Sequence, residues 1–148
     1  MVLADPALYA FTGGTPLSAP ALRERYQRLA AGAPDPEVTW GNWVIQDRRT
    51  GRLAGYVQAT ITAGQRGREA EIAWVVGTGW QGQGLATEAA RGLAGWLAGH
   101  GVATIVAHIH PDHHASAAVA AAVGLSPSGG WHDGEQRWQG TLAPRADP

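Results

Sequence analysis

The chain has 148 residues, 45% of them hydrophobic, which suits one folded domain over residues 1–148 and excludes a disordered chain. Its 11 basic and 12 acidic side chains form no run of like charge, so neither nucleic acid nor a membrane surface is an expected partner. No stretch approaches the ~18 apolar residues of a membrane span, and the N-terminus lacks the pattern of a signal peptide. We therefore expect a cytoplasmic protein, which agrees with the absence of cysteine.

Two missing residue types exclude several chemistries. The absence of cysteine rules out disulfides, thiolate metal sites and a cysteine nucleophile. The sequence also contains no lysine, so all of its permanently charged basic side chains are arginines. A lysine-containing phosphate loop, a Schiff-base lysine and a lysine general base are therefore excluded as well.

The first half of the chain predicts a helix followed by strands. Ser18 suits a helix N-cap, and the apolar side chains after it recur at helical spacing until Gly32. The next two apolar runs are separated by a short polar turn, which favours a hairpin. Three strands are predicted, at 40–46, 53–62 and 71–76, with a turn at 47–51 and a loop at 63–68.

The second half alternates helices and strands. Apolar residues from Leu85 recur at helical spacing until Gly99, and Ser116 is expected to cap a short alanine-rich helix that Gly124 closes. This order predicts a mixed α/β fold with a mainly antiparallel sheet, rather than a doubly wound parallel sheet. The predicted elements are a helix from 85, a strand at 102–110, a loop at 111–115, a helix at 116–123, and turns from 125 before a last strand at 136–142.

The segment from Gly77 to Gly84 follows a predicted strand and opens a helix, so backbone N–H groups and the helix dipole converge there. Glycines let the main chain approach a bulky anion, and a pyrophosphate is the expected occupant; a plain flexible connection is the alternative. The segment also contains Gly-x-Gly-x-x-Gly, but a dinucleotide fold needs a parallel βαβ unit and an acidic residue about 20 positions on. Because the next acidic residue beyond the helix is Asp112, that interpretation is disfavoured.

The register Gln81-x-x-Gly84-x-Ala86 resembles the acetyl-CoA loop of the GNAT superfamily of N-acetyltransferases. The chain is similar to the branch that includes the ribosomal-protein N-terminal acetyltransferases. This resemblance implies a twisted, mainly antiparallel sheet with flanking helices, and acetyl transfer from acetyl-CoA to a primary amine. It covers roughly residues 5 to 130 and rests on Glu71-Ile-Ala-Trp-Val-Val, Trp80-Gln-Gly-Gln-Gly-Leu-Ala-Thr-Glu-Ala and His110-Pro-Asp-His-His-Ala-Ser.

The same resemblance implies where the cofactor binds. The strand from Ile72 to Val76 would splay from its neighbour and pair its main chain with the pantetheine arm. An N–H near Val75 or Val76 would polarise the thioester carbonyl, and Trp74 would either wall the groove or belong to the core. The implied cofactor-binding residues are Trp74, Val75, Val76, Gln81, Gly82, Gln83, Gly84, Leu85, Ala86, Thr87, His113 and Ser116.

The chain departs from the family pattern at three points. His113 occupies a position where relatives typically carry an Asn that contacts pantetheine. Ala120 stands where many relatives carry a Tyr that protonates the leaving thiolate. Relatives in this branch usually have a further strand and helix before the point where this chain starts. An uncovered sheet edge, together with seven Trp side chains, would favour a homodimer.

Glu71 is the first candidate for the base that takes the proton of the acceptor amine, because strand alternation would let it line the acceptor cleft. A solvated or salt-bridged glutamate is the equally weighted alternative, and Glu69 is the neighbouring candidate. Ser116 could also donate to the leaving thiolate, and His110 could relay a proton because histidine titrates near neutrality.

A cluster of histidines and a group of arginines could each suggest a ligand site, but simpler roles are favoured for both. A metal site is disfavoured because, apart from Asp112, no carboxylate or cysteine stands beside the clustered histidines. Arginines around the predicted hairpin turn are more typical of a solvated surface than of a phosphate site. The first group is His108, His110, His113 and His114, and the second is Arg48, Arg49 and Arg52.

The sequence therefore predicts an acetyl-CoA-dependent N-acetyltransferase that acts by direct attack in a ternary complex. The acceptor would be the primary amine of a small molecule or a peptide N-terminus, and no residue pattern chooses between them. The main alternative is a non-catalytic acyl-CoA-binding or assembly protein with the same fold. A dinucleotide-binding module is the weaker alternative.

Overall fold

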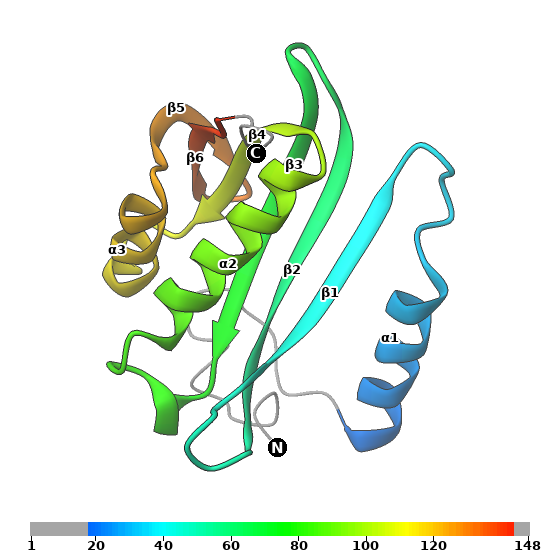
Figure 1. The fold of residues 1–148 in the computed structure, drawn as a ribbon, viewed down its shortest axis with the longest axis vertical. Helices are drawn as coiled ribbons and strands as arrows, with labels where there is room; N and C mark the ends of the chain where they lie inside the picture. Colours follow the sequence, from blue (N-terminus) through cyan, green and yellow to red (C-terminus); the bar gives the residue numbers. More distant parts are fainter. Residues whose placement is uncertain (1–17, 144–148) are drawn as a thin grey trace.

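The computed structural model describes residues 18–143 and shows a six-stranded sheet with three α-helices (Figure 1). Neighbouring strands are antiparallel except β3 and β4, which are parallel, so the predicted mixed α/β fold with a mainly antiparallel sheet is confirmed. The sheet order is β1-β2-β3-β4-β6-β5. The elements are α1 (Ala19–Ala31), β1 (Thr39–Gln46), β2 (Leu53–Gly64), β3 (Gly67–Val76), the 3₁₀-helix η3 (Thr78–Trp80), α2 (Leu85–Gly99), β4 (Val102–Ile109), α3 (His114–Val123), β5 (Ser126–His132) and β6 (Glu135–Thr141).

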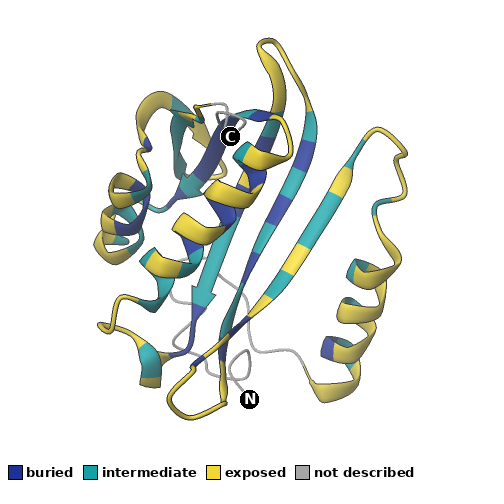
Figure 2. Cartoon of the chain, viewed as in Figure 1, coloured by how far each residue is buried: buried dark blue, intermediate teal, exposed yellow. Residues whose placement is uncertain are grey.

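The two longer helices form where the apolar spacing predicts them. α1 begins after Ser18, whose side chain accepts a hydrogen bond from the N–H of Ala21 at 3.3 Å. α2 turns one stripe toward the sheet and leaves the opposite side exposed (Figure 2). No helix within residues 18–143 has the length and apolar content to cross a membrane. The buried stripe of α2 consists of Ala90, Leu93, Ala94 and Leu97.

α1 and α2 lie on opposite faces of the sheet. Ala59 and Ile61 of β2 belong to the same core cluster as Leu97 of α2. Thr60 stands between them in the strand, so its side chain points to the other face. There, Leu29 of α1 and Thr60 line a small cavity of about 210 Å³. The sheet therefore separates the region beside α1 from the region beneath α2 and α3.

The predicted hairpin turn between β1 and β2 is confirmed, and Asp47 holds it. This side chain is buried, and it accepts the N–H of Arg49 at 3.0 Å and the hydroxyl of Thr50 at 3.4 Å. The Asp47 N–H donates to the carbonyl of Arg52 at 2.9 Å, which closes the turn. The hydrogen bond from the Arg49 N–H lowers the pKa of Asp47, so the carboxylate is favoured.

Two segments predicted as loop or turns are strands. The prediction of a loop at 63–68 is wrong because β2 and β3 keep pairing to Gly64↔Gly67. Only residues 65 and 66 lie between the paired residues, and Gly67, with a positive φ of 110°, begins β3 directly after them. The serine, proline and glycine of 126–132 predict turns, yet these residues form β5. β5 pairs with β6 at both ends and is irregular between Pro127 and Trp131, so cross-strand pairing outweighs the local composition.

β3 and β4 pair only over their first residues. The parallel pairs run from Arg68↔Val102 to Glu71↔Val106, yet β3 continues to Val76 and β4 continues to Ile109. The two strands therefore separate beyond Glu71, as the family resemblance implies. Among residues 18–143, this separation leaves one main-chain edge of β3 without a strand partner and opens the centre of the sheet.

Gly55 of β2 lies close to the backbone of β3, where a side chain would not fit, and this yields a stability prediction. A Cβ at this position would lie 1.9 Å from the carbonyl oxygen of Val75. We expect Gly55→Ala to lower the free energy of unfolding by about 1–3 kcal/mol, as overpacking typically does. Urea unfolding measures this, with Gly92→Ala in α2 as the control, because a Cβ there meets open space and should stabilise by about 0.5–1 kcal/mol. Equal unfolding midpoints for the two variants would contradict the close contact.

Candidate active site

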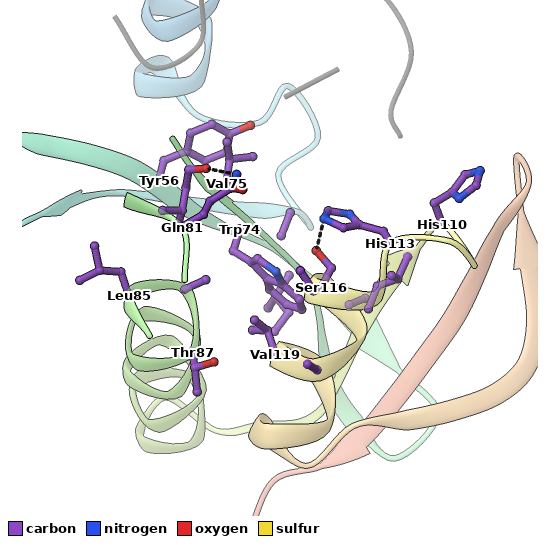
Figure 3. A pocket seen from close by; sticks show the side chains of 18 of the residues that line it. Tyr56, Trp74, Val75, Gln81, Leu85, Thr87, His110, His113, Ser116 and Val119 are labelled. Atoms are coloured by element: carbon purple, nitrogen blue, oxygen red, sulfur yellow. Dashed lines mark hydrogen bonds between the residues drawn. The ribbon is translucent and has the colours of Figure 1, made fainter. Parts of the chain in front are cut away.

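A cavity of about 670 Å³ lies where β3 and β4 separate. Strand β3, the glycine-rich loop with the start of α2, and the start of α3 form most of its wall (Figure 3). Nearly all of the residues predicted to bind the cofactor line it. These are Trp74, Val75, Val76, Gln81, Gly82, Gly84, Leu85, Ala86, Thr87, His113 and Ser116.

Gln83 is the one predicted cofactor residue that does not line this cavity. Its side-chain amide donates to the carbonyl of Gly79 at 3.4 Å, and its side-chain oxygen accepts a hydrogen bond from Arg49 at 2.6 Å. Arg52 lies over the ring of Trp80, 5.7 Å from its centroid. The arginines of the β1–β2 turn are thus not only a solvated surface, because two of them contact the glycine-rich segment.

The start of α2 is free of a side-chain cap and faces the cavity. Its N-cap residue, Gly84, has a left-handed backbone (φ 78°) that carries no side chain over the helix end. The first helical hydrogen bond is donated by Glu88 to the Gly84 carbonyl at 3.0 Å. The N–H groups of the preceding turn therefore point along the axis toward the loop. An anion bound there would gain hydrogen bonds and a favourable interaction with the helix dipole.

Gln81 fixes the loop against the end of β3. Its side-chain amide donates to the main-chain carbonyl of Val76 at 3.0 Å (Figure 3). On the other side of β3, the N–H of Gly77 donates to Ala54 at 2.7 Å. Because hydrogen-bonded pairs alternate along an antiparallel ladder, the N–H groups of Trp74 and Val76 point away from β2. They face the opening toward β4.

The cavity reaches both faces of the sheet. Side chains alternate along β3, so Trp74 lies on the face of α2 and α3, whereas Glu71 and Val75 lie on the opposite face. Tyr56 and Gln58 of β2 line the cavity on this second face, since Tyr56 is paired with Val75. A molecule that enters from beneath the helices can therefore meet a second one that enters from the other side.

Glu71 carries an ionic contact at the point where the strands separate. Its Oε1 atom lies 3.0 Å from Nδ1 of His108 on β4. The Glu71 side chain is 57% exposed, whereas that of His108 is 18% exposed. The ring of His132 lies beside the His108 ring, with centroids 5.3 Å apart. Glu135 of β6 also lines the cavity, so two carboxylates far apart in sequence meet in this cavity.

The start of α3 differs from the prediction. The expectation that Ser116 caps this helix is wrong, because the N-cap residue is His113 and the helix begins at His114. The N–H of His113 donates to the His110 carbonyl at 2.9 Å, and this turn starts the helix two residues early. Ser116 instead lies 3.3 Å from Nε2 of His113, inside the cavity (Figure 3).

Burial lowers the pKa of His113, and the charge of His110 lowers it further. The neutral ring of His113 is therefore favoured at neutral pH, beside the Ser116 hydroxyl. His110 lies at the rim of the cavity with its ring directed away from Ser116 (Figure 3). Its Nδ1 accepts the N–H of Asp112 at 3.1 Å, so in the neutral ring the proton belongs to Nε2.

The structure places the histidines in separate roles rather than in one cluster. Within residues 18–143, no group of three or more His, Asp or Glu side chains has an arrangement that could hold a metal ion. His108 contacts Glu71, His110 contacts its own loop, and His113 contacts Ser116.

Sequence reasoning missed several cavity residues. Tyr56 and Gln58 lie on β2, whose pairing with β3 the sequence pattern does not specify, and Glu135 enters from β6. His108 was considered only as a metal ligand. The alternation of side chains along β4 was the available signal, since Val106 is paired with Glu71 and His108 lies on the same face as Val106.

Comparisons with known proteins agree with this fold. The model of the acetyltransferase (GNAT) domain family matches residues 1–126. Spermidine N-acetyltransferase from Vibrio cholerae, in complex with CoA and spermine, is similar in fold, with a TM-score of 0.71 at 15% identity. That match covers 97% of this chain and 87% of that chain. A search of curated protein sequences finds no match.

Two further structures share the fold. The GNAT domain of S. lividans PAT has a TM-score of 0.71 at 20% identity, covering 95% of this chain and 80% of that chain. A phosphinothricin acetyltransferase from Sinorhizobium meliloti, in complex with AcCoA, has a TM-score of 0.64 at 22% identity, covering 96% of this chain and 77% of that chain. With the family model matching most of its length, the chain belongs to the GNAT acetyltransferase domain family.

Proposed function

We propose that the protein transfers an acetyl group from acetyl-CoA to the primary amine of a small molecule or peptide, by direct attack in a ternary complex. One observation carries this proposal: a single cavity runs through the opening between β3 and β4. It joins the uncapped start of α2 to Glu71 on the other face of the sheet. A donor and an acceptor can therefore meet without a covalent enzyme intermediate.

The cavity wall suits acetyl-CoA. The start of α2 and the loop before it would hold the pyrophosphate, and the unpaired edge of β3 would pair with the pantetheine arm. The main-chain N–H of Val76 faces the opening and would donate to the thioester carbonyl oxygen. Two structures similar to this one are complexes with CoA or AcCoA, which supports the same cofactor here.

Residues that line the cavity can supply each proton transfer and hydrogen bond that the reaction needs. The amine must first lose a proton to the Glu71–His108 pair, after which its lone pair attacks the thioester carbon. The Val76 N–H would stabilise the developing oxyanion. As the C–S bond breaks, the thiolate of CoA would take a proton from the Ser116 hydroxyl, which lines the cavity beside neutral His113. The second proton that the nitrogen loses on forming the amide would restore the Ser116 hydroxyl, so CoA leaves as the thiol. Ala120, fully buried and without a hydroxyl, cannot supply a proton to the thiolate.

Two carboxylates in the cavity wall, Glu71 and Glu135, favour an acceptor that arrives as a cation. A similar structure is that of a spermidine N-acetyltransferase with spermine bound, which supports a small amine. The resemblance to ribosomal-protein N-terminal acetyltransferases supports a peptide N-terminus instead. The proposed reaction is the same for both acceptors.

A direct assay tests the proposed function. Because the chain contains no cysteine, the thiol of released CoA is the only thiol in a purified reaction. We expect a thiol-reactive dye to report CoA release when acetyl-CoA is mixed with a panel of polyamines, amino acids and short peptides. Acetyl-CoA at 100 times its dissociation constant should also add about 2.7 kcal/mol of stability. Stabilisation by CoA with no acetylated amine would favour the acyl-CoA-binding alternative, and stabilisation by NAD alone would favour a dinucleotide module.

Gly84 offers a matched pair of variants for the pyrophosphate site. Asp and Asn have similar shapes and both tolerate a left-handed backbone, so Gly84→Asp and Gly84→Asn should cost similar folding stability. They differ in charge, and we expect Gly84→Asp to weaken CoA binding at least 10-fold more than Gly84→Asn. Titration calorimetry checks this, with Gly79→Ala as a mild control because its Cβ meets open space. Equal CoA affinities for Gly84→Asp and Gly84→Asn would contradict the binding of a phosphate at this helix end.

Homodimerisation stays a prediction. In the described part of the chain, β1 pairs with β2 only, which leaves one of its main-chain edges without a strand. Val44 on β1 and Trp96 on α2 are large apolar side chains with 66% and 41% exposure. Covering such surfaces by a second copy would remove them from water. We expect light scattering to give the mass of a dimer at micromolar concentration, and a monomer mass would contradict this.

A further inference from the structure

The contact between Glu71 and His108 lies where the two strands separate. Glu71 is in the last parallel pair of β3 and β4, and His108 stands two residues beyond its partner Val106. Both side chains line the cavity, and Oε1 of Glu71 lies 3.0 Å from Nδ1 of His108. These two residues are 37 positions apart in the sequence, so only the fold brings them together.

The contact determines which ring nitrogen of His108 can accept a proton. A carboxylate can only accept a hydrogen bond, so Nδ1 must donate to Glu71. In the neutral ring, Nδ1 then carries the hydrogen and Nε2 carries the lone pair. His110 has the opposite arrangement, because its Nδ1 accepts from a backbone N–H. Of these two histidines, His108 is therefore the one whose Nε2 is ready to act as a base.

We propose that Nε2 of His108 takes the proton of the acceptor amine and that Glu71 is a positioning residue acting through His108. This inference rests on the proposed function and assigns the roles within its proton transfer. The ammonium gives one proton to Nε2, and the freed lone pair attacks the thioester carbon. As the C–S bond breaks, the second proton that the nitrogen loses reaches the leaving thiolate through Ser116, and the imidazolium of His108 later loses its proton to solvent. Glu71 holds the ring tautomer and stabilises the positive charge that forms on the ring.

Solvent exposure favours this division of roles. The Glu71 side chain is 57% exposed, and one of its oxygens is already engaged by His108. The His108 side chain is only 18% exposed, so fewer water molecules compete with a bound amine for its nitrogen. A base that is positioned by a second group and partly shielded from water fits the usual arrangement for general-base catalysis.

The charged groups around His108 come from three strands. Glu71 faces it from β3, and Arg137 is its cross-strand partner on β6. Arg137 is 3.8 Å from Glu69, so an acidic partner offsets its charge. His132 at the end of β5 lies beside the ring, and Glu135 lines the same cavity. Two carboxylates thus accompany the imidazolium that forms in the reaction.

Two substitutions at His108 test whether its side chain acts as the general base or has only a structural role. The amide nitrogen of Asn occupies nearly the place of Nδ1, so His108→Asn keeps the hydrogen bond to Glu71 but lacks Nε2. We expect it to lower kcat by about 10² to 10⁴, with acetyl-CoA affinity unchanged. In His108→Gly, free imidazole should restore part of kcat. Glu71→Gln can still accept from Nδ1 and should lose less activity than His108→Asn, with the acidic limb of its pH profile displaced.

Several results would overturn the assignment. Full activity of His108→Asn, with strong loss in Glu71→Gln, would make Glu71 itself the base. Failure of imidazole to restore activity in a folded His108→Gly variant that still binds CoA would also overturn the assignment of His108 as the base. The tautomer offers a readout apart from activity: the ¹⁵N shifts of His108 should show the Nδ1–H form, and this form should be lost in Glu71→Ala. The Nε2–H form in the unmodified protein would overturn the inference while leaving the proposed function standing. An unmodified protein that acetylates no amine would instead overturn the proposed function.

Discussion

The separation of β3 from β4 is the constraint on which the rest of the structure depends. Backbone N–H and C=O groups inside a sheet are normally paired, and burying them without a partner is costly. Beyond Glu71, the β4 side of β3 has no strand neighbour within the described part of the chain, and the side-chain amide of Gln81 satisfies the Val76 carbonyl at its end. The remaining edge lines a cavity open to ligands. A sheet that stayed paired to Val76 would have a continuous core and no room for a substrate.

The helices make this opening chemically useful. α2 and α3 cover one face of the sheet, and both begin at the cavity. α2 presents unpaired N–H groups because glycine, and not a capping side chain, stands before it. α3 begins with His113 and brings Ser116 into the wall. The opposite face contributes carboxylates, so anion-binding and cation-binding groups are held on different sides of the same opening.

Much of the fold could be predicted because its signals are local. Helical spacing after Leu85 and the glycine-rich turn before it located α2 within a residue. β5 could not be found in this way, because Ser-Pro-Ser-Gly-Gly favours turns and only the presence of β6 makes it a strand. The start of α3 depends on a turn closed by the His110 carbonyl, which a capping preference for Ser116 does not reveal. The Glu71–His108 contact depends on a register that no single strand encodes.

The turn between β1 and β2 is connected to the glycine-rich loop by a short chain of contacts. Asp47 fixes the turn through the N–H of Arg49, and the side chain of Arg49 donates to Gln83. A ligand that orders the loop would therefore also restrain the tip of this hairpin, although the tip lies outside the cavity wall. Amide hydrogens in the hairpin should then exchange more slowly with solvent when the loop is occupied. Through this link, ligand binding at the centre of the sheet would reduce the mobility of a hairpin at its outer part.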